Sequence, residues 1–181
     1  MLVLFTGPPG TGKSTLAEAV ADTMHASVLG WDWVMAAFTT FSTVQASLSS
    51  LDPVEHRKVG WSIIRNLAVA QLRNGRSVML DGVARDNEVA QIRRTAATEG
   101  ARCIVIATMC TDVAEHERRL VGRTRGIPGW HELEWDSVAN LLARWTAPGD
   151  ADLVLDAMND LDANRRELLQ LIGTPEVSEL R

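Results

Sequence analysis

The sequence contains no tyrosine, only two cysteines and no long apolar run. Cys103 and Cys110 have neither the spacing of metal ligands nor a disulfide pattern, so we expect buried, reduced thiols. Apolar runs such as 104–107 are far shorter than the roughly 20 residues that span a bilayer. The first apolar run ends at Phe5 and follows no basic segment, which argues against a secretory signal. These absences predict a soluble, cytoplasmic protein without membrane attachment.

Positive charge is also scarce. The 18 Lys and Arg residues stand against 23 Asp and Glu residues, for a formal net charge of −5. An acidic chain is poorly suited to coat nucleic acid, although a local basic cleft remains open. The length of 181 residues indicates one domain. We expect that domain to cover 1–173, followed by a frayed tail at 174–181, in a monomer or a homodimer.

The most informative motif follows the apolar run Leu2–Phe5 and matches the phosphate-loop pattern G-x-x-x-x-G-K-[ST]. Its glycines let successive backbone N–H groups point at phosphate oxygens, and the next helix adds its free N-terminal amides. Lys13 places a cation on the β- and γ-phosphates, and the Ser14 hydroxyl can ligate Mg²⁺. The motif therefore predicts binding of ATP with Mg²⁺ by Gly7, Pro8, Pro9, Gly10, Thr11, Gly12, Lys13, Ser14 and Thr15.

Short apolar runs alternate with segments of helical period, which is typical of a parallel sheet covered by helices on both faces. The predicted fold is α/β, with three layers and five parallel strands. We expect strands at 2–6, 27–30, 77–80, 102–108 and 152–155. Helices are expected after each of them, including one that begins after Asp52 and carries Val59, Ile63, Leu67 and Ala70 on one face. The Ser- and Thr-rich segment 39–50 is either a mobile loop or a weak helix.

Two acids follow the second and third predicted strands, where ligands of doubly wound sheets bind. Burial of Asp32 between Trp31 and Trp33 would raise its pKa and suit it to accept a proton from an acceptor hydroxyl. Alternatively, Asp32 is the N-cap of the helix that follows it. Asp81 can hold Mg²⁺ together with Ser14, contact the acceptor, or serve as a turn residue before a glycine.

A basic cluster, composed of Arg118, Arg119, Arg123 and Arg125, lies in the segment 118–136, which also contains glycines and Pro128. Such a segment can move as a lid, and an arginine that closes over phosphates accelerates transfer by roughly 10³–10⁵. The alternative is a solvated helix end whose cations complement the helix dipole.

The aromatic content comes mostly from six tryptophans. Trp31 lies beside the candidate base and Trp130 within the candidate lid, so either indole can stack on a planar substrate. The alternative is a packing role, which we expect for Trp61 and Trp145.

On these residues the chain resembles the small P-loop kinases related to chloramphenicol phosphotransferase, phage polynucleotide kinase, gluconate kinase and the zeta-toxin kinases. The resemblance covers 2–172 and includes the phosphate loop, both acids, the arginine cluster and the closing strand 152–156. It implies the sheet order 2-3-1-4-5 and a helical lid. It also implies that Lys13, Arg119 and Arg123 act on the phosphates and that Asp32 is the catalytic base.

The resemblance implies an ATP-dependent phosphotransferase acting on a hydroxyl of a sugar, antibiotic, nucleoside or similar metabolite. The helical insertion 33–75 would form the acceptor side, and residues 118–136 would form the lid. The expected acceptor contacts are Trp31, Asp32, Asp81, Arg85 and Trp130. Polynucleotide kinases carry an arginine where this chain has Met35, which counts against a nucleic-acid acceptor. Two alternatives stay open: a polynucleotide 5′-hydroxyl kinase and a nucleotide-dependent switch or ATPase.

Overall fold

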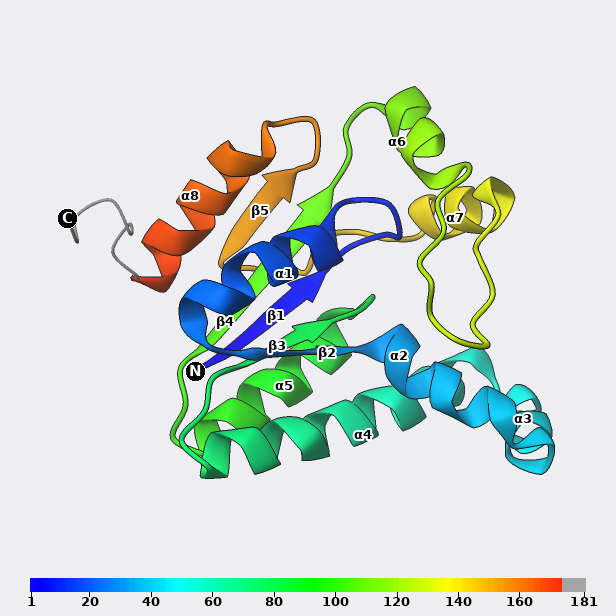
Figure 1. Cartoon of the computed structure of the whole chain (residues 1–181), viewed down its shortest axis with the longest axis horizontal. Coiled ribbons are helices and arrows are strands. Elements are labelled where there is room, and N and C mark those ends of the chain that lie inside the picture. Colours follow the sequence, from blue (N-terminus) through cyan, green and yellow to red (C-terminus); the bar gives the residue numbers. More distant parts are fainter. Residues whose placement is uncertain (174–181) are drawn as a thin grey trace.

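A computed structural model describes residues 1–173, and the predicted tail at 174–181 lies outside them. Five parallel strands form one sheet in the order β2-β3-β1-β4-β5, which confirms the predicted fold and strand order (Figure 1). The strands are β1 (Leu2–Thr6), β2 (Ser27–Gly30), β3 (Val78–Asp81), β4 (Cys103–Met109) and β5 (Leu153–Asp156). The helices are α1 (Lys13–Met24), α2 (Trp31–Ala36), the 3-10 helix η1 (Ala37–Thr40), α3 (Ser42–Ser49), α4 (Pro53–Arg73), α5 (Asp86–Thr98), α6 (Val113–Leu120), α7 (Trp135–Leu142) and α8 (Leu161–Ile172).

The central strand β1 is fully buried, and its alternating side chains divide the core into two layers. Val3 and Phe5 pack with α1 and α8, whereas Leu2 and Leu4 pack with α4 and α5. Figure 1 shows these helix pairs on opposite faces of the sheet. Within residues 1–173, no helix combines the length and apolar character needed to cross a membrane.

Helix α4 presents a different face to the core from the expected one. Its buried residues are Gly60, Trp61, Ile64 and Ala68, while Leu67 is 43% exposed. The two stripes differ by about one residue, or a 100° rotation, and both are apolar enough to pack. Contact with α5 and the sheet decides between them, because Trp61 and Ile64 fill that layer.

The cysteines are less buried than expected. Cys103 and Cys110 are free and partly buried. Partial burial raises the pKa of Cys103 to about 11 and also raises the pKa of Cys110. Both thiols are therefore held in the neutral form, which is unreactive toward electrophiles.

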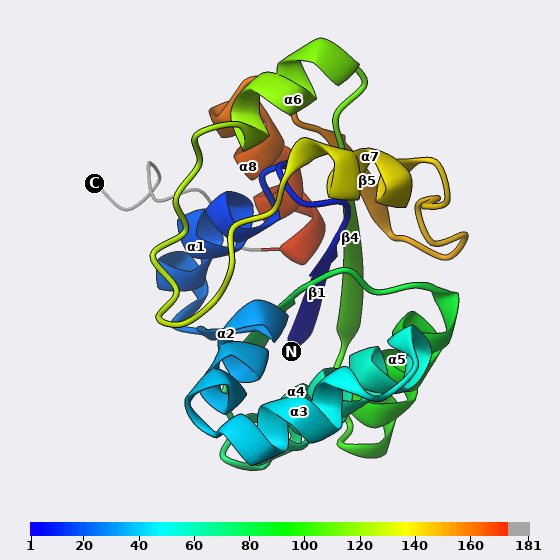
Figure 2. The same ribbon diagram turned by 90° about the vertical axis from the view of Figure 1, so that its right-hand side faces the viewer.

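The carboxyl edge of the sheet faces the viewer in Figure 2 and is flanked by the loops that carry the predicted site. The phosphate loop follows β1, α2 follows β2 directly, and Asp81 ends β3. Segment 39–50 is helical, in η1 and α3. The candidate lid is helical only at its start and end, and residues 121–134 form a loop between α6 and α7. This loop descends toward α2 and closes one side of the edge.

Candidate active site

The phosphate loop adopts the backbone that the motif predicts. Gly12, the N-cap of α1, has φ 81°, a left-handed conformation that favours glycine. A Cβ on Gly7 would lie 2.3 Å from the carbonyl oxygen of Thr108, so the loop passes β4 too closely for any side chain. Glycines thus let the loop curl over β1 and leave the first amides of α1 free for an anion.

Lys13 lies inside this loop and is only 8% exposed. Its Nζ donates a hydrogen bond to the carbonyl oxygen of Pro8 at 2.8 Å. Burial lowers the pKa of Lys13 to about 8, an effect that attraction to Asp81 opposes and that Arg123 and Arg125 reinforce. The ammonium is therefore a buried cation with little anionic compensation, and a phosphate would supply that compensation.

Ser14 and Asp81 meet beside this lysine. Ser14 Oγ donates a hydrogen bond to Asp81 Oδ2 at 2.6 Å. The other carboxylate oxygen, Oδ1, is buried without a hydrogen-bond partner among the described residues. A hydroxyl and a carboxylate with an unused oxygen fit Mg²⁺, which prefers a few protein oxygens together with phosphate oxygens. The pair suits the magnesium role predicted for it.

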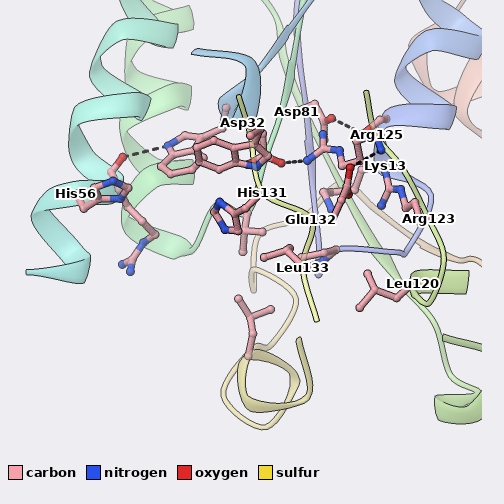
Figure 3. Close-up of a pocket in the computed structure, with 18 of the residues that line it drawn as sticks. Lys13, Asp32, His56, Asp81, Leu120, Arg123, Arg125, His131, Glu132 and Leu133 are labelled. Atoms are coloured by element: carbon pink, nitrogen blue, oxygen red, sulfur yellow. Dashed lines mark hydrogen bonds and ion pairs between the residues drawn. The ribbon is translucent and has the colours of Figure 1, made fainter. Parts of the chain in front are cut away.

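A cavity of about 350 Å³, the Asp32 cavity, opens beside these residues (Figure 3). Lys13, Ser14 and Arg123 line it. Its wall also includes all five predicted acceptor-side residues: Trp31, Asp32, Asp81, Arg85 and Trp130. The tertiary structure therefore joins the phosphate loop to residues that come from α2, the end of β3 and the lid loop.

A second cavity of about 380 Å³, the Arg119 cavity, also borders the phosphate loop. It is lined by Gly10, Thr11, Gly12, Lys13, Ser14, Thr15, Leu16, Arg119, Arg123, Ala157, Asn159, Leu161 and Asn164. Lys13, Ser14 and Arg123 line both cavities, so the two spaces meet at the phosphate loop. Gly7 and Pro8 line neither cavity.

The environment of Asp32 differs from the expected one. Trp33 is 55% exposed, so the two flanking indoles do not bury the carboxylate between them. Asp32 lies in the first turn of α2, whose N-cap is Gly30, and so it is not the N-cap either. Its carboxylate pairs instead with the guanidinium of Arg125, which reaches across from the lid loop.

The four clustered arginines divide into distinct roles. Arg118 is exposed and pairs with Glu115. Arg119 also pairs with Glu115, and its Nη1 donates to the carbonyl oxygen of Ala157 at 2.8 Å. Arg119 thus borders only the Arg119 cavity, whereas Arg123 borders both. Burial lowers the pKa of Arg125, although a guanidinium stays charged in proteins.

His116, which no sequence motif singles out, lies beneath the phosphate loop and is 1% exposed. Its Nε2 lies 2.6 Å from the carbonyl oxygen of Pro9 and therefore donates to it. The ring also packs edge-on against Trp135, with the ring centroids 5.5 Å apart. A lone histidine on a helix offers no sequence signal for such a contact. Four polar residues that the sequence motifs did not single out also line the Asp32 cavity: His56, Arg57, His131 and Glu132.

The chain is similar in sequence to one protein family and to three curated proteins. A family model described as an AAA domain (AAA_33) matches residues 2–148. The chain is 30% identical over 129 residues to the uncharacterized protein Rv2004c of Mycobacterium tuberculosis, a match that covers 69% of this chain and 26% of that protein. The chain thus spans about a quarter of the length of the curated relatives it matches.

Several solved kinase structures share the fold. A sugar kinase from Janibacter sp. HTCC2649 has a TM-score of 0.70 at 18% identity, covering 96% of this chain and 94% of that one. A gluconokinase from Sinorhizobium meliloti 1021 has a TM-score of 0.66 at 18% identity, covering 93% and 89%. The APS kinase CysC of Mycobacterium tuberculosis, in complex with AMPPNP and APS, has a TM-score of 0.63 at 19% identity, covering 95% and 96%. The likeness at these identities is one of fold.

Proposed function

Since the chain belongs to the AAA_33 family of AAA domains, we propose that it is an ATP-dependent kinase that phosphorylates a hydroxyl group of a small molecule. One observation carries the proposal: Lys13 and Ser14 of the phosphate loop share a cavity with the carboxylate of Asp32. The fold shared with a sugar kinase, a gluconokinase and an APS kinase supports it. Met35 is 3% exposed and does not line the cavity, which favours a small acceptor over a polynucleotide end.

In this proposal the backbone amides of the loop, the N-terminus of α1 and Lys13 hold the phosphates of ATP. Ser14 and Asp81 would hold Mg²⁺, which neutralises charge on the β- and γ-phosphates when bound. Arg123 borders both cavities, so its guanidinium can follow the γ-phosphoryl group as it passes from one to the other.

Asp32 is the proposed base. The acceptor hydroxyl gives its proton to this carboxylate, its oxygen bonds to the γ-phosphorus, and the bond to the β-phosphate oxygen breaks to leave ADP. In the structure the guanidinium of Arg125 forms an ion pair with the Asp32 carboxylate, so the acceptor hydroxyl must displace Arg125 to reach it. Arg125 is then free to turn toward the phosphates, which the acceptor hydroxyl approaches from the same cavity.

The direct test is ADP release from Mg-ATP in the presence of a panel of hydroxylated metabolites and antibiotics. We expect at least one acceptor to stimulate release strongly over the rate without acceptor. A nucleotide-dependent switch or ATPase would instead hydrolyse ATP at the same rate with every compound in the panel. That result would remove the kinase proposal.

The pKa of Lys13 predicts a pH dependence of ATP binding. In the free protein this pKa is about 8, so the lysine is charged below that pH and mostly neutral above it. Phosphate oxygens favour the charged form and raise the pKa on binding, so binding takes up a proton above pH 8. The Kd for AMPPNP should be flat below pH 8 and rise by up to about tenfold per pH unit above it. Calorimetry in buffers of different ionisation enthalpy measures this uptake, and its absence would contradict the assignment.

A substitution at Asp81 separates its two candidate roles. We expect Asp81→Asn to raise the Mg²⁺ concentration for half-maximal activity by roughly 10–100-fold, because it removes a charged ligand. Asp86→Asn is the matched control, since Asp86 is exposed on α5 and lines neither cavity. A higher KM for the acceptor with an unchanged Mg²⁺ requirement would assign Asp81 to the acceptor instead.

A further inference from the structure

We infer that the acceptor alcohol carries a planar aromatic ring, which packs against a wall of four aromatic side chains while its hydroxyl reaches Asp32. The inference rests on the proposed kinase function and names the substrate class for the same site. The aromatic wall consists of Trp31, His56, Trp130 and His131, all of which line the Asp32 cavity.

The wall is continuous although its residues come from separate elements. Ring centroids are 5.7 Å apart between His56 and Trp31, 6.0 Å between Trp31 and Trp130, and 4.8 Å between Trp130 and His131. Figure 3 shows His56 and His131 on one side of Asp32 and Lys13 on the other. The cavity thus has an aromatic end and a phosphate end, with the candidate base between them.

Two glycines leave room for the side chain of Trp31. A Cβ on Gly60 would lie 2.3 Å from Trp31 Nε1, and a Cβ on Gly82 would lie 2.9 Å from Trp31 Cβ. Gly60 lies inside α4, where glycine destabilises a helix relative to alanine. Glycine at this position makes room for the indole ring, so the sequence of α4 helps to determine where Trp31 lies.

The lid loop brings Trp130 to the same place. Gly129, immediately before it, has φ 71° and lies against η1, where a Cβ would be 2.4 Å from Thr39 Oγ1. The close approach of lid and η1 sets Trp130 edge-on to Trp31, with an interplanar angle of 74°. Residues from both sides of the cavity therefore complete one aromatic surface.

The polar contacts at the aromatic end leave the face of the Trp31 indole to a ligand. Trp31 Nε1 already donates to the carbonyl oxygen of Arg57 at 3.3 Å, which leaves the indole face rather than its donor for the ligand. Arg57 itself is paired with Glu88 at 3.6 Å. A guanidinium such as those of Arg57 and Arg85, which both line the cavity, also stacks well on a planar ring.

The test uses pairs of acceptors that share an alcohol and differ in the ring, such as a nucleoside with ribose and phenyl glucoside with methyl glucoside. ADP release is measured with Mg-ATP, and binding of the same compounds is measured by calorimetry with Mg²⁺ and AMPPNP. We expect the ring-bearing member of an accepted pair to have a KM lower by about tenfold or more.

Variants of the wall provide the second measurement. Trp130→Ala should raise the KM and Kd of the ring-bearing compound about tenfold with kcat within about twofold, and Trp130→Phe should restore most of the affinity. Trp33→Ala is the control, because Trp33 belongs to α2 but is exposed and outside the cavity. Gly60→Ala, which displaces Trp31 without removing it, should weaken ring binding in the same direction.

The outcomes separate this inference from the kinase proposal. Equal use of ring-free acceptors, a Trp130→Ala variant with unchanged KM and Kd, or no binding by any ring-bearing compound would overturn the inference. Ring binding that depends on Trp130 without any ADP release would uphold the inference and reject the kinase proposal.

Discussion

Replacement of Lys13 with alanine is expected to lower kcat/KM by about 10³-fold or more while leaving the fold intact. Lys13 is the cation inside the phosphate loop, and removal of a preorganised group that stabilises transition-state charge costs about 10²–10³ in kcat, to which weaker ATP binding adds. ADP release under saturating acceptor measures the loss. Lys58→Ala is the matched control, since Lys58 is the only other lysine in the chain and is exposed on α4.

The same variant should not unfold the protein. Burial lowers the pKa of Lys13 to about 8, below its ordinary value of 10.5, so the folded protein disfavours the charged form. This penalty is fully present below pH 8 and declines as the pH rises toward 10.5. Alanine removes this penalty and so stabilises the folded state, whereas loss of the hydrogen bond to Pro8 destabilises it by about 1 kcal/mol. Thermal unfolding of the nucleotide-free protein should therefore show a Tm equal to or above that of the wild type near pH 7. A large fall in Tm would make Lys13 structural.

Replacement of Asp32 with asparagine is expected to lower kcat by about 10²–10⁴-fold and to change ATP affinity little. The variant keeps the size of the side chain but cannot accept the proton of the acceptor hydroxyl. ATP affinity should hold because its phosphates are held by the loop, not by α2. Kinetics with varied acceptor, together with calorimetry of AMPPNP binding, separate the two effects.

Asp22→Asn serves as the control for Asp32, since Asp22 is an exposed acid on α1 that lines neither cavity. An unchanged kcat in Asp32→Asn would reduce Asp32 to the partner of Arg125. The ion pair alone predicts a different result, because breaking it would free the lid loop and alter acceptor KM rather than kcat.

The phosphate loop was predictable because its chemistry is local. The proposed binding of phosphate there depends on backbone amides, on the positive φ angles of the three loop glycines and on adjacent Lys13 and Ser14, all within one contiguous stretch. The carboxyl edge was predictable for a related reason. Parallel strands bring their ends together, so acids that follow β2 and β3 must lie near the loop that follows β1.

The partner of Asp32 was not predictable. Arg125 could be assigned to an arginine cluster, but its pairing with Asp32 joins residues that are far apart in the chain. The contact of His116 with the Pro9 carbonyl likewise depends on where α6 lies over the loop. The face of α4 was ambiguous for the same reason, because two adjacent apolar stripes fit one helix and only packing selects Trp61 and Ile64.

The five strands, the phosphate loop and the edge of the sheet that we propose as the ligand site could be predicted from the sequence, because hydrophobic period, glycine conformation and strand direction are encoded within short segments. Three features depend on the packed fold: the residue that faces Asp32, the buried side of α4, and the joining of Trp31, His56, Trp130 and His131 into one wall. Those features depend on how distant helices and loops pack, and packing energy belongs to the whole fold rather than to any one segment.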